Sequence, residues 1–163
     1  MTTSFQDGMF SKASGQFEDA ISHFTLAVKQ NENKCAALLQ LGLCYRDLGN
    51  VVHANKCFDQ VIKHCRAEAK SKPNDPNLQY VKGYAYMSRT NYKPSLIQVL
   101  KKKTNSTLLA IRYFDRAIEL DPSHAASHLN KGFAMTALKK HSEAEECFKR
   151  ASELAHAKSS IKI

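Results

Sequence analysis

Long apolar runs and secretion signals are missing from this 163-residue sequence. No apolar run approaches the roughly 20 residues that a membrane-spanning helix needs. The first ten residues, MTTSFQDGMF, lack the basic and apolar regions of a secretory signal peptide. We therefore expect a protein that does not associate with membranes and that resides in the cytoplasm, with the nucleus as the alternative.

Motifs that carry catalysis or hold cofactors are also missing. The sequence has no glycine-rich phosphate loop, no nucleophile elbow and no His-Glu-x-x-His zinc motif. His124 and His128 lie four residues apart on one face of an expected helix, but no spacing completes a tetrahedral ligand set. Glu145 and Glu146 lie within one turn of Lys149, which is typical of a solvated ion-pair face. These absences predict a protein without enzymatic activity, cofactor or metal.

C-x-x-C pairs are absent, although the chain has five cysteines. An odd number of thiols without such a pair is typical of reduced cysteines in an intracellular protein, where a buried thiol packs as a small hydrophobic group. Four of the five lie within apolar helical patterns. We expect a structural role for Cys35, Cys44, Cys57, Cys65 and Cys147.

Acidic residues are in the minority. Lys and Arg number 24 against 15 Asp and Glu, which gives a formal net charge of +9. Such an excess favours encounters with acidic proteins, nucleic acid or anionic surfaces. The run from Lys101 to Lys103 could contact nucleic acid or direct the protein to the nucleus, but Tyr92 is the only aromatic residue near it. Nucleic acid is therefore not the partner we expect, and a basic surface that binds an acidic protein or RNA is kept as an alternative.

What the sequence does contain is an internal repeat with a period of 34 residues. A shift by this period superposes glycines, alanines and phenylalanines. The superposed pairs are Gly8 and Gly42, Gly15 and Gly49, Ala20 and Ala54, Phe24 and Phe58, Ala110 and Ala144, and Phe114 and Phe148. Four units follow, at 1–34, 35–68, 76–122 and 125–158, and we treat 1–163 as a single array.

Each unit has the pattern of two packed helices. Small residues at fixed offsets let two helices cross closely, and the recurring Phe fills the space between neighbouring pairs. Asp75 followed by Pro76 is a helix start signal, since Asp can cap exposed amides and Pro is tolerated in the first turn. Apolar periodicity predicts an all-α chain with helices near 4–14, 17–30, 34–48, 51–70, 76–90, 107–120, 124–139 and 142–158.

Two departures from the period indicate insertions. Gly42 and Gly83 are 41 residues apart, seven more than the period, and we expect the extra residues to lengthen the second helix of the second unit through 65–70. Gly83 and Gly132 are 49 residues apart, so that 15 residues, 91–105, are inserted in the third unit. We predict a short helix in this insertion, a break at the polar run 104–107 and a new helix after it. One unbroken helix from near Pro94 to Leu120 is the alternative.

The pattern resembles the tetratricopeptide repeat, whose 34-residue unit is a helix, a turn and a helix. Residues 110–122, AIRYFDRAIELDP, read like the second helix of this family and its closing proline. The first unit departs from the family with Ser4 and Asp7, and the fourth with His128 and Lys131, at places that usually hold large apolar residues. The resemblance implies a right-handed α-solenoid of about four helix hairpins, with an insertion in the third.

In this family the first helix of each pair lines a concave groove, and the second helix lies outside. Positions three and four residues apart on the first helices then give the groove residues. They are Phe5, Met9, Leu39, Gln40, Leu43, Tyr80, Val81, Tyr84, Met87, Leu129, Asn130 and Phe133. Exposed apolar and aromatic surfaces of this kind usually mark an interaction site, and packing against neighbouring repeats is the alternative.

These residues predict a non-catalytic scaffold or adaptor that binds an apolar or amphipathic segment of another protein or peptide. A self-assembling structural component, and hence a homo-oligomer, is the alternative. Family members that clamp the C-terminal carboxylate of heat-shock chaperones use Lys, Asn and Arg side chains in the groove. Here the matching places are Phe5, Met9, Gln40, Asn77 and Val81 or, read from the second unit, Leu39, Leu43, Val81, Ala126 and Asn130. Because none of them is a cation, we expect no chaperone clamp.

Overall fold

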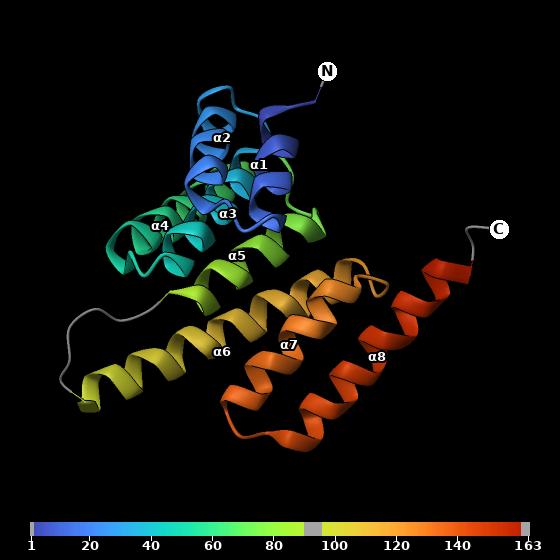
Figure 1. Ribbon diagram of the computed structural model, residues 1–163. Helices are drawn as coiled ribbons and strands as arrows, with labels where there is room; N and C mark the ends of the chain where they lie inside the picture. Colours follow the sequence, from blue (N-terminus) through green and yellow to red (C-terminus); the bar gives the residue numbers. More distant parts are fainter. Residues whose placement is uncertain (1, 90–95, 161–163) are drawn as a thin grey trace.

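The computed structural model describes residues 2–89 and 96–160 of the chain, with side chains for 2–89 and 104–157. Within these residues every regular element is a helix (Figure 1). The helices are α1 (Ser4–Ala13), α2 (Phe17–Lys29), α3 (Lys34–Asp47), α4 (Val51–Glu68), α5 (Pro76–Ser88), α6 (Leu96–Leu120), α7 (Ala125–Ala137) and α8 (His141–Ser160). The prediction of an all-α chain is confirmed, and only the start of α6 differs by more than about two residues from its predicted place.

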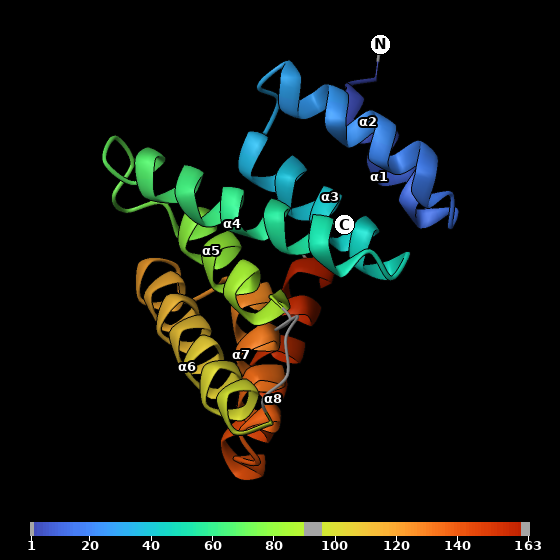
Figure 2. The ribbon, with the colours of Figure 1, turned by 90° about the vertical axis from the view of Figure 1, so that its left-hand side faces the viewer.

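The helices stack as hairpins in a right-handed α-solenoid (Figures 1 and 2). Within the hairpins α1 packs on α2, α3 on α4, α5 on α6 and α7 on α8. The second helix of each hairpin also packs on the first helix of the next. α5 contacts both α3 and α7, so the first helices lie side by side along the array. This is the arrangement that the resemblance implies.

In each hairpin a glycine of the first helix faces a phenylalanine ring of the second. The pairs are Gly8 with Phe24, Gly42 with Phe58, Gly83 with Phe114, and Gly132 with Phe148. A Cβ atom placed on any of these glycines would lie 2.5–2.8 Å from the facing ring, so a larger residue would push the helices apart. The repeating Gly and Phe are therefore the residues that let the two helices cross.

Turn and cap residues set the helix ends. Gly15 and Gly49 both have a φ angle of +75°, a left-handed conformation that other residues rarely adopt. Asp75 caps α5, because its Oδ1 accepts a hydrogen bond of 2.8 Å from the Asn77 amide, and Pro76 occupies the first turn. The start signal at Asp75 is therefore confirmed.

The second and third hairpins contain the expected extra residues, but one prediction about them is wrong. α4 is lengthened as expected, but it ends at Glu68 and not at the predicted residue 70. α6 is a single helix from Leu96 to Leu120, so the predicted break at 104–107 is wrong and the unbroken alternative is right. The polar residues of that run cost only a few tenths of a kcal/mol each in helix propensity. Thr107 and Ala110 are 6% and 0% exposed, and burial of this kind outweighs so small a cost.

Residues 91–95 of the predicted insertion lie outside the described residues. Residues 96–105 form the first part of α6.

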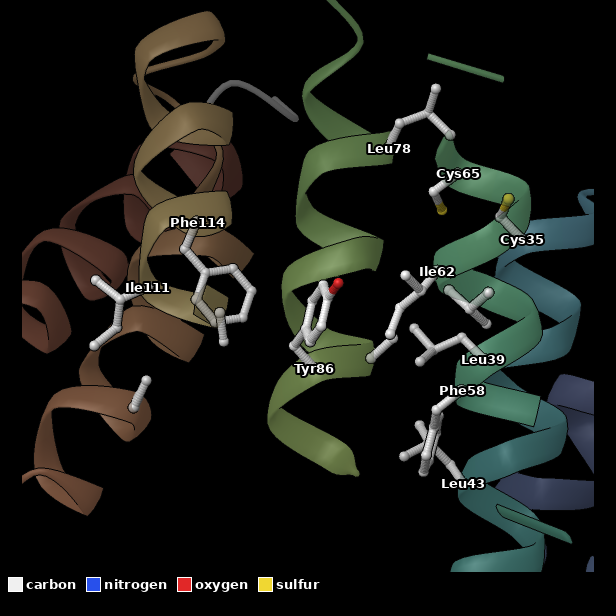
Figure 3. Close-up of a cluster of buried hydrophobic side chains, with 14 of the residues drawn as sticks. Cys35, Leu39, Leu43, Phe58, Ile62, Cys65, Leu78, Tyr86, Ile111 and Phe114 are labelled. Carbon is white, nitrogen blue, oxygen red and sulfur yellow. The ribbon is translucent and has the colours of Figure 1, made fainter. Parts of the chain in front are cut away.

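Two buried clusters fill the array. The smaller lies among α1, α2, α3 and α4, and the larger runs from α3 to α8. Figure 3 shows part of the larger cluster, with Ile62 and Cys65 of α4 on one side of α5 and Ile111 and Phe114 of α6 on the other. α5 is thus enclosed on two sides, and through it the second and third hairpins share one core.

Candidate functional site

A hollow of about 490 Å³ opens where α1, α3 and α5 lie side by side. Side chains three and four residues apart on a helix share a face, so each of the three helices contributes several lining residues. The lining residues are Met9, Lys12, Ala13, Ala36, Leu39, Gln40, Leu43, Tyr80, Val81 and Tyr84. The sequence pattern predicts all of them as groove residues except Lys12, Ala13 and Ala36.

The hollow has a buried floor and an accessible rim. Leu39 and Leu43 have exposed fractions of 5% and 6% and belong to the larger core. Met9 is 41% exposed, and Val81 and Tyr84 are half-buried. The apolar surface that a partner can reach therefore comes mainly from Met9, Val81 and Tyr84, while the two leucines shape the floor.

Tyr80 is fixed among other rings. Its ring centroid lies 6.0 Å from those of Tyr84 and Phe114 and 5.1 Å from that of His124. Its hydroxyl accepts a hydrogen bond of 3.3 Å from Nδ2 of Asn130. Burial, with a smaller contribution from the neighbouring Tyr84, raises the pKa of Tyr80 to about 12, while the Asn130 hydrogen bond opposes the shift. Tyr80 is thus a neutral, well-held wall of the hollow.

Asn130 and His124 support this wall from α7. Asn130 is 7% exposed and also donates a hydrogen bond of 2.9 Å to the carbonyl oxygen of Ala126. His124 precedes α7, and its Nδ1 accepts a hydrogen bond of 3.2 Å from the Ser127 amide. Asn130 therefore positions Tyr80 and offers little surface itself, and His124 has a structural role at a helix start.

Lys12 adds a cation to the hollow that the groove prediction does not contain. Its Nζ donates a hydrogen bond of 2.7 Å to Oε1 of Gln40, which ties α1 to α3 across the hollow. Burial lowers the pKa of Lys12, although Cys44 and Asp47 oppose this shift in part. The signal that identifies Lys12 is its place three residues after Met9, on the same helix face.

A second hollow of about 420 Å³ continues the first along α3 and α5. Ala36, Tyr80 and Val81 line both hollows. Charged residues also line the second one, namely Lys34, Glu68, Lys72 and Asp75. We call the two hollows together the groove, whose surface changes from apolar to charged along its length.

The other predicted groove residues lie outside both hollows. Phe5 packs on Phe24, with ring centroids 5.7 Å apart, and Met87 packs against the larger core. Leu129 and Phe133 of α7 are 41% and 52% exposed, and Leu129 lines a separate apolar hollow between α7 and α8. The structure therefore does not bring these α7 residues to the groove.

The remaining sequence features concern the cysteines, possible metal ligands and membrane-spanning helices. All five cysteines are free thiols and buried, and burial raises the pKa of Cys57 to about 11, which keeps that thiol protonated. Over residues 2–89 and 96–160, no group of three or more His, Cys, Asp or Glu residues is placed to hold a metal ion. In the same part of the chain no helix combines the length and apolar character that crossing a membrane requires.

Stacked helix hairpins in which a glycine of one helix faces a phenylalanine of the other are the architecture of the tetratricopeptide repeat. Comparison with known families agrees. Profiles described as tetratricopeptide repeat match residues 103–156 and residues 36–65. The chain belongs to the tetratricopeptide repeat family. Repeats of this family indicate a protein-interaction scaffold, and their fold is typically non-catalytic.

Two curated relatives are much longer than this chain. Superkiller protein 3 of Schizosaccharomyces pombe is 25% identical over 162 residues, covering 88% of this chain and 12% of that protein. The probable UDP-N-acetylglucosamine--peptide N-acetylglucosaminyltransferase SPINDLY of Hordeum vulgare is 24% identical over 132 residues, covering 81% and 12%. The chain thus spans about an eighth of the length of each relative.

Solved structures share the fold. TTC0263, a thermophilic tetratricopeptide repeat protein of Thermus thermophilus, is 21% identical with a TM-score of 0.68, over 93% of this chain and 72% of that one. The human IFIT1 dimer with m7Gppp-AAAA is 19% identical with a TM-score of 0.62, over 91% of this chain and 32% of that one. At these identities the likeness shows the fold alone.

Proposed function

We propose that this chain is a non-catalytic adaptor that binds an apolar or amphipathic segment of another protein in the groove. The observation that carries the proposal is the hollow of about 490 Å³, to which three successive hairpins contribute. Binding sites are typically concave and mostly apolar, with a few polar groups that fix orientation. Met9, Val81 and Tyr84 supply accessible apolar surface, and Leu39 and Leu43 supply a firm floor.

The held position of Tyr80 favours binding. Its ring contacts Tyr84, Phe114 and His124, and its hydroxyl bonds to Asn130. A side chain that is ordered before binding loses little conformational entropy when a partner packs on it. Tyr80 and Tyr84 are therefore the aromatic anchors of the proposed interface, since binding energy concentrates in a few well-packed aromatic residues.

Charge along the groove restricts the partner further. The apolar hollow contains Lys12, and the second hollow contains both cations and carboxylates. A segment with apolar side chains at one end and polar or charged ones at the other fits this change of surface. The five free, buried thiols support a reducing compartment such as the cytoplasm.

A chaperone tail is not the proposed partner. Nζ of Lys12 already donates to Gln40, and burial lowers its pKa, so it is poorly suited to hold a terminal carboxylate. Affinity that rests on apolar area should change little with added salt.

Selection from a random peptide library displayed on phage tests the proposal without a known partner. We expect selected peptides to be apolar or amphipathic, and the double variant Tyr80→Ala/Tyr84→Ala to weaken their binding by about 2 kcal/mol or more, roughly 30-fold. Met9→Asp, at an exposed position, gives a second test with less risk to the fold. Leu26→Ala is the matched control, because Leu26 is 45% exposed on α2 and lines neither hollow.

Two results would contradict the proposal. One is peptide binding that survives both the tyrosine changes and Met9→Asp. The other is micromolar binding of an acidic chaperone tail that high salt abolishes and the tyrosine changes leave untouched.

A further inference from the structure

α1 exposes a large apolar residue at a place where the other first helices bury a small one. Two residues after the repeating glycine stand Cys44 in α3, Ala85 in α5 and Ala134 in α7, each 0% exposed. These residues lie in the clusters that α3, α5 and α7 share with the preceding hairpin. In α1 the same place holds Phe10, which is 73% exposed. We call this side of α1, with Asp7 and Phe10, the head face.

α7 and α8 expose a surface equivalent to the one on α3 and α4 against which α5 packs. α5 packs on α4, where the places three, four and seven residues after the repeating Phe are Val61, Ile62 and Cys65, which are 0%, 7% and 1% exposed. In α8 these places are Ala151, Ser152 and Ala155.

Ser152 and Ala155 are exposed, and all three of these α8 residues line an apolar hollow of about 450 Å³. Leu129, Phe148 and two alanines at the start of α7 complete it. No helix of the described residues covers this hollow, which we call the tail face.

The two faces are complementary in size. Inside the array, the small Ala85 of α5 lies in the same buried cluster as the larger Val61 and Ile62 of α4. On the two exposed faces the sizes are exchanged, because the head face offers Phe10 and the tail face offers the exposed Ser152 and Ala155. A large residue on small ones fills about the same space as a small residue on large ones. Generic exposed apolar patches would not show this exchange.

The two faces are also complementary in charge. The residue after the repeating Phe forms an ion pair with the next hairpin at two internal interfaces. Asp59 bonds to Arg89 at 3.2 Å, and Asp115 bonds to Lys131 at 2.7 Å. In α8 this place holds Lys149, which is exposed.

Lys131 stands immediately before the repeating glycine of α7, and the corresponding residue of α1 is Asp7. A head face placed on a tail face would therefore bring Asp7 to Lys149, with the signs of the internal pair reversed.

We propose that the partner of the tail face is the head face of a second copy of this chain. α1 of one copy packs on α7 and α8 of the other, as α5 packs on α4 within the chain. Phe10 enters the hollow beside Ala151, Ser152 and Ala155, and Asp7 pairs with Lys149. The interface is heterologous, so it leaves one head and one tail uncovered and adds copies in a row. It uses neither hollow of the groove and is independent of the function proposed above.

Sedimentation of the 163-residue chain over a range of concentrations tests the association. We expect the mean mass to rise continuously with concentration, without stopping at a dimer. Phe10→Asp and Ser152→Glu should each weaken association at least tenfold, and both positions are exposed, so circular dichroism should show an unchanged helix content. Val52→Asp is the control, because Val52 is 43% exposed but lies on neither face. It should leave the association unchanged.

Mixing the two variants distinguishes a head-to-tail contact from a symmetric one. Phe10→Asp keeps an intact tail, and Ser152→Glu keeps an intact head. At a concentration where each variant alone is monomeric, an equal mixture should therefore form a one-to-one complex that grows no further. Asp7→Lys and Lys149→Asp should each weaken association a few-fold, and the double exchange in one chain should restore it.

Four outcomes would overturn the proposal. The chain could stay monomeric up to millimolar concentration, it could stop at a closed dimer, or its association could be indifferent to Phe10→Asp and Ser152→Glu. A mixture of the two variants that stays monomeric would also overturn it.

Discussion

The second hairpin, α3 and α4, and the fourth, α7 and α8, share a residue pattern but differ in their surroundings. The second is covered on both sides, by α2 and by α5. The fourth packs on α6 at one side, and its tail face is open in the described residues. Phe58 is 0% exposed, whereas the equivalent Phe148 is only half-buried. The comparison teaches that the neighbour, and not the repeat pattern alone, decides what a residue contributes to stability.

The largest expected effect is a difference between these two phenylalanines. Phe58→Ala should lower the free energy of unfolding by about 3 to 5 kcal/mol, and Phe114→Ala by a similar amount, since both rings are fully buried. Phe148→Ala should cost clearly less, because part of its ring already faces solvent. Urea denaturation of the three variants measures this. Equal losses for Phe58 and Phe148 would show that the open face does not matter.

The glycine contacts give the next largest effect. A Cβ atom on Gly42 would lie 2.6 Å from the Phe58 ring, and one on Gly132 would lie 2.5 Å from the Phe148 ring. Gly42→Ala should destabilise the chain by roughly 1 to 3 kcal/mol, because Phe58 is enclosed and cannot move away. Gly132→Ala should cost less, because the half-buried Phe148 can shift. Thermal unfolding of both variants checks the order, and a larger loss for Gly132→Ala would contradict it.

Helix capping at the start of α5, which follows the second hairpin, predicts a smaller effect on stability. Asp75 caps α5 through its carboxylate, and replacing an Asp cap by Ala usually costs about 1 kcal/mol. Asp75→Ala should therefore lower the unfolding free energy by about this amount at neutral pH. Asp75→Asn is the matched control and should retain most of the stability. A loss of several kcal/mol for the Asn variant would indicate that the carboxylate does more than cap the helix.

The smallest effect on stability at neutral pH is expected at Tyr80 of α5, whose hydroxyl accepts a hydrogen bond from Asn130 of α7. Its pKa is raised from 10.0 to about 12, so the folded chain keeps this proton after the unfolded chain has lost it. The stabilising contribution is complete below pH 10 and is lost as the pH rises toward 12. Tyr80→Phe should thus make unfolding less dependent on pH in this window. An unchanged dependence in urea denaturation between pH 10 and 12 would refute the assignment.

The fold was predictable because its determinants are local and repeated. The pairing of Gly42 with Phe58 follows from residue types at fixed offsets, and the same offsets recur in every hairpin. The predicted break at 104–107 is wrong because weak helix propensity alone does not account for the burial of Thr107 and Ala110 in the fold. Tertiary packing outweighs propensity when no proline or glycine interrupts the run.

The groove was only partly predictable, since helical spacing says which side chains share a face but not what covers that face. Leu39 and Leu129 have the same place in their units, yet one is 5% and the other 41% exposed. Leu39 lies under α5, and Leu129 lines the open tail face. Lys12 was missed for a different reason, because its role depends on the hydrogen bond to Gln40 of another helix.

Hydrogen–deuterium exchange at low and high protein concentration is the most direct test of the central claim. The claim is that the tail face is an interface of the kind that joins neighbouring hairpins, and that it is uncovered in a single copy. The second and fourth hairpins then serve as internal references for each other. We predict that amides of α1 and α8 gain protection as the concentration rises, while those of α3 and α4 stay unchanged. Protection that does not depend on concentration in α1 and α8, or that rises equally in all helices, would contradict the account.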